Sequence, residues 1–82
     1  MSRLVYCEIK ERFDTYALYK VGSTIDDMSG EVIFYKESMI PNIIKQPNTN
    51  TVTETSVSRV RMKYKNSFDK GEFPEKMSVE IG

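Results

Sequence analysis

The 82-residue chain contains no histidine and no tryptophan, has one cysteine, and carries 12 acidic and 12 basic residues, so that its net charge is zero. Without histidine, the chain cannot form a Ser-His-Asp triad, a Cys-His pair or an imidazole-ligated metal site. One cysteine excludes intramolecular disulfides and thiolate zinc clusters. We therefore expect a protein without catalytic activity, metal or cofactor.

Long apolar runs are also missing. No stretch has the length of a signal peptide or of a membrane-spanning helix, and the single cysteine is typical of a reducing compartment. The composition, 39% hydrophobic and 29% charged, is that of a folded domain. We expect one cytoplasmic domain over residues 1–82 that does not associate with membranes. Its core is small enough for self-association or a partner to add stability.

The first half of the sequence has the period-two alternation of β-strands. Apolar and charged residues alternate over 4–13, and the pattern returns over 16–21 after a short Asp-Thr turn. Two strands this close in sequence predict an antiparallel hairpin. Residues 31–36 are rich in β-formers and predict a third strand, whereas 40–44 either cover a sheet edge or form a short fourth strand.

The segment 53–71 fits two structures. As a helix, it lines one face with Val57, Val60, Tyr64 and Phe68. Thr51 and Thr53 are candidate N-caps, and Gly71 suits the left-handed position after a helix. As a strand, residues 58–65 also alternate with period two. We choose the helix because its capping signals fit both ends, and the strand remains the alternative.

Residues 76–81 alternate again and predict a last strand. The layout is therefore β-β-β-(β)-α-β. It predicts an α+β fold with a mainly antiparallel sheet of four to five strands and one helix packed on one face.

The order of a strand hairpin, an Asp/Gly loop, a strand and a basic helix that runs into Gly71–Lys76 resembles short uncharacterised protein families of low-GC Gram-positive bacteria. The resemblance covers most of the chain. It implies the layout above and a bacterial cytosolic or mobile-element origin, and it carries no function over.

Two features have reactive groups but suggest no chemistry. Cys7 shares its strand face with Val5 and Ile9, which favours a buried thiol. Asp26 and Asp27 lack the alternating oxygen ligands of a calcium loop. We interpret them as turn residues that bind the local backbone.

Four positive charges lie within seven residues, at Arg59, Arg61, Lys63 and Lys65. On a helix, they could contact phosphate groups of a nucleic acid. The other interpretation is a solvated helix face whose cations pair with acids on the sheet. The neutral total charge favours the second, so nucleic-acid binding is the alternative function.

The first hairpin has apolar residues on both faces. The face expected to meet the helix carries Val5, Cys7, Ile9, Ala17, Tyr19 and Val21. The opposite face carries Leu4, Tyr6, Tyr16 and Leu18, interleaved with Lys10, Arg12 and Lys20. Tyrosine and arginine are favoured at interfaces, and clustered exposed apolar residues mark interaction sites. We therefore expect a protein-interaction or self-association surface at Tyr6, Tyr16, Leu18 and Lys20, with a homodimer as one form.

Overall fold

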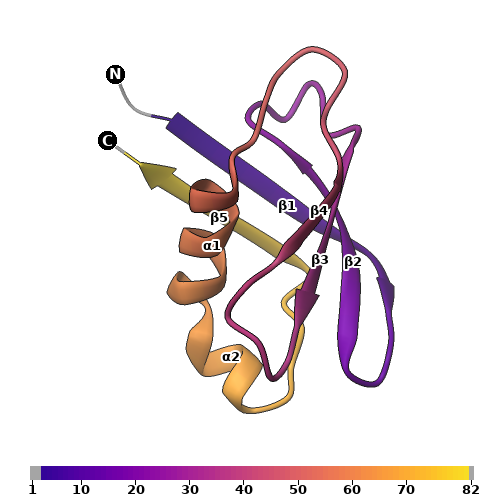
Figure 1. Ribbon diagram of the computed structural model, residues 1–82, viewed down its shortest axis with the longest axis vertical. Coiled ribbons are helices and arrows are strands. Elements are labelled where there is room, and N and C mark those ends of the chain that lie inside the picture. The colour runs from indigo at the N-terminus through magenta and orange to yellow at the C-terminus, as the bar shows by residue number, and fades with distance from the viewer. Residues whose placement is uncertain (1–2, 82) are drawn as a thin grey trace.

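A computed structural model describes residues 3–81 and shows a five-stranded antiparallel sheet with two helices on one of its faces (Figure 1). The elements are β1 Arg3–Arg12, β2 Tyr16–Gly22, β3 Gly30–Tyr35, β4 Asn42–Lys45, α1 Glu54–Lys63, α2 Lys65–Asp69 and β5 Lys76–Ile81. The strand order is β4-β3-β2-β1-β5, so the last strand returns to pair with the first. The predicted α+β class is confirmed, and the short fourth strand is present.

The segment 53–71 is helical, as chosen, but it forms two helices. Thr53 caps α1, because its side-chain oxygen accepts a hydrogen bond of 3.1 Å from the backbone N–H of Ser56. The backbone leaves helical geometry at Tyr64, with φ −103° and ψ 20°, and α2 begins at the next residue. Gly71 has φ 77°, the left-handed conformation that a glycine adopts without a Cβ penalty. The predicted ends are confirmed, and the break at Tyr64 is new.

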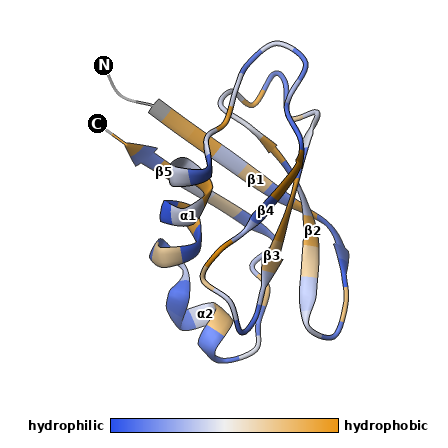
Figure 2. Ribbon diagram, viewed as in Figure 1, coloured by the Kyte–Doolittle hydropathy of each residue, from blue (hydrophilic) through white to orange (hydrophobic). Residues whose placement is uncertain are grey.

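The core lies between one face of the sheet and the helices. Most of its buried side chains come from the strands and from one stripe of the helices, and they include Val5, Cys7, Ala17, Tyr19, Val21, Val32, Phe34, Val57, Val60 and Phe68. Figure 2 shows the helices mostly in the hydrophilic colour, because only this narrow stripe is apolar. The predicted helix face is confirmed, with Tyr64 half-buried against the same core.

A β-bulge in β1 changes which face its last residues occupy. The register with β2 shifts between Ile9 and Glu11, so that Glu11 lies opposite Leu18 and Arg12 opposite the buried Ala17. The expectation that Arg12 lies on the same face as Lys10 and Lys20 is therefore wrong. Arg12 reaches the helical side of the sheet instead, where its Nη2 donates to the carbonyl oxygen of Phe73 at 3.3 Å.

Asp27 joins two loops that lie side by side at one end of the sheet (Figure 1). Its Oδ2 accepts hydrogen bonds from the backbone N–H of Thr49 at 2.6 Å and from the Thr49 hydroxyl, while Oδ1 accepts from Ser29. The backbone of Gly22 passes so close that a Cβ there would lie 2.1 Å from the carbonyl oxygen of Asp27. The predicted turn role of Asp27 is thus only half of its role, because its carboxylate also binds the loop that precedes α1.

The hydrogen bonds from Ser29 and Thr49 hold the pKa of Asp27 well below its ordinary value. Because the folded pKa is depressed, the stabilisation by Asp27 is present above about pH 4 and is lost as the pH falls through the folded value. We expect Asp27→Asn to lower the melting temperature at pH 7 and to make stability less dependent on pH below about 4. Asp26→Asn is the matched control, since Asp26 is exposed and engages Thr24 only through its backbone. Thermal melts at several pH values check this, and equal pH profiles for both variants would contradict it.

Candidate functional site

The four residues predicted to bind a partner lie on the face of the sheet that the helices leave uncovered. Along β2, the buried Ala17 and Tyr19 alternate with the half-buried Tyr16, Leu18 and Lys20. Tyr6 lies on the same outer face of β1. The strand register places these four side chains in different rows across the sheet, and the rows differ in chemistry.

An apolar patch occupies the end of this face where β1 turns into β2 and where β3 leads towards β4. It consists of Phe13, Tyr16, Leu18, Ile33 and Tyr35, and we call it the β2–β3 patch. The ring of Phe13 stacks on Tyr16 with centroids 4.5 Å apart, and Tyr16 lies 6.3 Å from Tyr35. Phe13 remains 39% exposed. Stacked rings hold one another in place, so the patch offers a preformed apolar surface.

A row of charges with alternating sign crosses all five strands beside the patch. In strand order from β5 to β4, it contains Lys76, Glu8, Lys20, Glu31 and Lys45. Within the row, the Nζ of Lys20 lies 3.0 Å from a carboxylate oxygen of Glu8. Lys10, which lies outside the row, binds Glu31 at 2.7 Å. These lysines lower the pKa values of Glu8 and Glu31. Lys20 is therefore already paired with an acid of its own chain.

Tyr6 lies on the other side of the charged row from Tyr16 and Leu18. Its neighbours across the sheet are Gly22 and Ser78. It lines a separate hollow of about 670 Å³ together with charged residues of the row and two loop residues, Ile25 and Met28. The predicted four-residue surface thus consists of two areas divided by charge.

The four basic residues, three in α1 and Lys65 in α2, do not share one surface. Arg61 is 2% exposed, so it cannot contact phosphates as the other three could. Its Nε and Nη2 donate to the carbonyl oxygens of Tyr35 and Lys36 at 3.2 and 3.0 Å, and its guanidinium lies 4.1 Å from the ring centre of Phe68. Burial lowers the pKa of the guanidinium.

The remaining three basic side chains are exposed, and two of them have partners within the chain. Lys63 donates to the carbonyl oxygen of Ser78 at 2.8 Å, and Lys65 donates to Asp69 at 2.6 Å. Arg59 is exposed on α1. A phosphate would have to compete with these contacts of Lys63 and Lys65.

Of the reactive groups singled out in the sequence, Cys7 is buried, the Asp27 carboxylate is occupied, and Asp26 is exposed. Cys7 is 2% exposed, and burial raises the pKa of its thiol to about 12. The carboxylate of Asp27 accepts the hydrogen bonds described above. Among residues 3–81, no three acidic or cysteine side chains gather as a metal-binding group. None of the helices in this range combines the length and hydrophobicity needed to cross a membrane.

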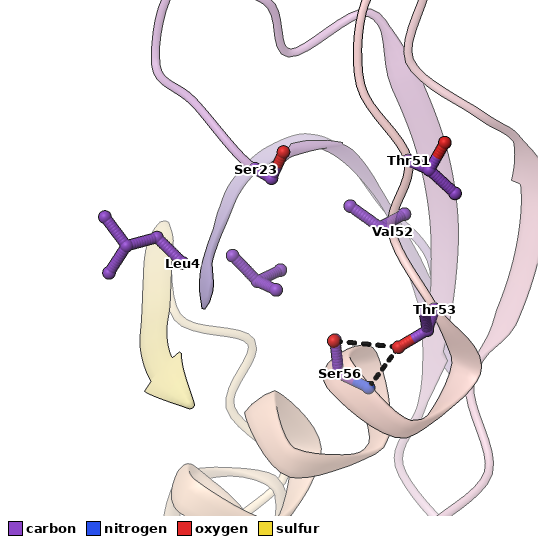
Figure 3. A pocket seen from close by; sticks show the side chains of 7 residues that line it. Leu4, Ser23, Thr51, Val52, Thr53 and Ser56 are labelled. Atoms are coloured by element: carbon purple, nitrogen blue, oxygen red, sulfur yellow. Dashed lines mark hydrogen bonds between the residues drawn. The ribbon is translucent and has the colours of Figure 1, made fainter. Parts of the chain in front are cut away.

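A second hollow, of about 500 Å³, lies at the first turn of α1 (Figure 3). The hydroxyl groups of Ser23, Thr51, Thr53 and Ser56 line it, together with three apolar side chains. Helix N-termini can bind anions through free N–H groups and hydroxyls. Here Thr53 and Ser56 are bonded to each other, as the dashed lines in Figure 3 show, and the Ser56 N–H is taken by the cap. None of the residues that line the hollow has a buried side-chain nitrogen or oxygen without a hydrogen-bond partner.

Sequence reasoning missed three members of the β2–β3 patch, namely Phe13, Ile33 and Tyr35. Ile33 and Tyr35 alternate with the buried Val32 and Phe34, so the period-two pattern of 31–36 contained the signal that would have placed them outward. Phe13 carries no such signal, because it follows the bulge and lies next to a turn.

Comparison with protein families, with curated proteins and with solved structures finds no match. The resemblance to bacterial proteins therefore stays a prediction.

The buried guanidinium gives a test of the basic segment. Arg61→Ala leaves two carbonyl oxygens without donors and opens space beside Phe68, so we expect the free energy of unfolding to fall by about 2–4 kcal/mol. Arg59→Ala, at an exposed site two residues earlier in α1, should change it by less than about 0.5 kcal/mol. Urea unfolding followed by circular dichroism measures both values. Similar values for the two variants would show that Arg61 is not a structural residue.

Proposed function

We propose that this chain is a small, non-catalytic, cytoplasmic module that binds protein, either another chain or a second copy of itself, through the β2–β3 patch. The observation that carries the proposal is the patch: aromatic and aliphatic side chains gather on a sheet face that the helices leave uncovered. Contiguous apolar surface of this kind is typical of interaction sites, and tyrosine is enriched at them.

The patch is also suited to binding in its energetics. Tyr16 and Tyr35 belong to paired central strands, and Phe13 stacks on Tyr16. Side chains that are already held in place lose little conformational entropy when a partner covers them. The charged row at the border of the patch supplies a polar rim, the usual surrounding of an apolar interface centre.

The chemistry of the chain supports a role in binding. It has no histidine to act as a base, its one thiol is buried with a raised pKa, and Asp27 holds two loops together. General acid-base and thiol chemistry need groups that reach a substrate with a suitable pKa.

Nucleic-acid binding through Arg59, Lys63 and Lys65 is the weaker alternative. Arg61 is withdrawn into the core, and the net charge of the chain is zero. Binding to phosphate backbones depends on an excess of positive charge over a continuous surface.

One substitution at the centre of the patch tests the proposal. Immobilised chain, incubated with an extract of its own cells, should retain a specific protein that can be identified and then bound again in purified form. Leu18→Asp should lose this binding, because it places a carboxylate where apolar contacts form. Met62→Asp is the matched control, since Met62 is 64% exposed on α1, on the opposite side of the sheet.

Equal binding by Leu18→Asp and Met62→Asp would overturn the proposal. Circular dichroism of both variants ensures that each keeps its fold, so that lost binding is not a consequence of unfolding.

A further inference from the structure

The outer face of β2 and β3 consists of matched cross-strand pairs. Three pairs follow one another along the two strands, namely Tyr16 with Tyr35, Leu18 with Ile33, and Lys20 with Glu31. Each pair joins an aromatic with an aromatic residue, an aliphatic with an aliphatic residue, or a positive with a negative charge. Within one chain such pairs stabilise the sheet, and they have a second effect when two copies meet.

We infer that the β2–β3 patch binds a second copy of this chain, face to face, around a two-fold axis that runs parallel to the strands between β2 and β3. This inference rests on the proposed function and specifies its partner. Rotation about that axis sets every residue of β2 opposite the copy of its own neighbour in β3. Leu18 then faces Ile33 of the second copy, Tyr16 faces Tyr35, and Lys20 faces Glu31, each twice per dimer.

The charged row restricts where the axis can lie. An axis along any single strand would set the row residue of that strand opposite its own copy, and any other row residues that overlap opposite residues of like charge. An axis between two strands sets opposite charges against each other along the whole row, because the sign alternates from strand to strand. An axis between β2 and β3 also sets Glu8 of β1 opposite Lys45 of β4 in the second copy. Like charges in an interface cost several kcal/mol, so the row favours this class of axis.

The apolar residues select one axis of that class. An axis between β1 and β2 would set Leu18 opposite Glu11, its neighbour in β1. An axis between β3 and β4 would set Ile33 opposite Asn42 and would overlap only the strands at one edge. The axis between β2 and β3 matches all three pairs and overlaps four strands of each copy.

The size of the surface sets the expected strength. Four strands at a spacing of about 4.8 Å and six residues at about 3.3 Å give a projected patch of about 19 by 20 Å. Its area is about half of the roughly 800 Å² that each partner buries in a standard interface. Stacked sheets cross at about 30°, so the pairs close to Leu18 and Ile33 stay opposed while the outermost pairs drift apart. We therefore expect a dimer with a micromolar dissociation constant.

Charge reversal tests the axis. In a Lys20→Glu homodimer, residue 20 faces Glu31 of the other copy at two places, and in a Glu31→Lys homodimer two lysines meet at each place. We expect each variant alone to raise the dissociation constant of the dimer at least about tenfold. A mixture of the two variants should recover the wild-type value, because each mixed dimer has opposite charges at both places. Sedimentation equilibrium of purified protein from micromolar to millimolar concentration measures all three.

Lys76→Glu is the matched control. This substitution creates the same kind of repulsion within the chain, beside Glu8. Because β5 lies outside the overlap, the dissociation constant of the dimer should not change. Weakening by Lys76→Glu would move the axis to the position between β1 and β2 and overturn the inference. A monomer at all concentrations, or a dimer that mixing does not restore, would overturn it as well. The binding test with Leu18→Asp is separate, since a pure monomer that still binds another protein through Leu18 leaves the proposed function intact.

Discussion

The ring of Phe68 in α2 connects β3, α1 and the segment before β5. It lies 6.0 Å from Phe34 of β3 and 5.6 Å from Phe73 of the segment that leads into β5, and the guanidinium of Arg61 lies over it. One strand of the sheet, both helices and the segment that leads into β5 therefore meet at one side chain. In a domain this small, the loss of one such contact would be a large fraction of the total stability. Arg61 joins α1 to the end of β3 at this point, because it also donates hydrogen bonds to the carbonyl oxygens of Tyr35 and Lys36.

Local patterns were sufficient to predict most of the elements, but they left the short strand β4 open and missed the break at Tyr64. The alternation in the strands, the helical stripe of Val57 and Phe68 and the left-handed Gly71 depend on neighbours within a few residues, so one sequence reveals them. The bulge that turns Arg12 to the other face, and the burial of Arg61, depend on contacts between residues far apart in the chain. Period counting carries no information about such contacts.

The candidate surface was predictable as a face but not as an arrangement. Alternation placed Tyr6, Tyr16, Leu18 and Lys20 on one side of the sheet, and they lie there. Which residues are neighbours across the strands depends on register, which turn geometry and the bulge determine. Composition gives only the zero net charge. The structure adds that five of the charged residues form one row of alternating sign across the five strands.

The break at Tyr64 has a consequence for how chains can meet. It directs the tyrosine hydroxyl to the outer edge of β5, where it accepts from the Ser78 N–H at 3.2 Å and lies 3.4 Å from the Ser78 carbonyl oxygen. Lys63 donates to the same oxygen. An edge strand with free backbone groups invites the addition of foreign strands and the growth of aggregates. Tyr64 and Lys63 occupy the backbone groups of Ser78 in the middle of this edge, so they oppose the addition of a foreign strand at β5.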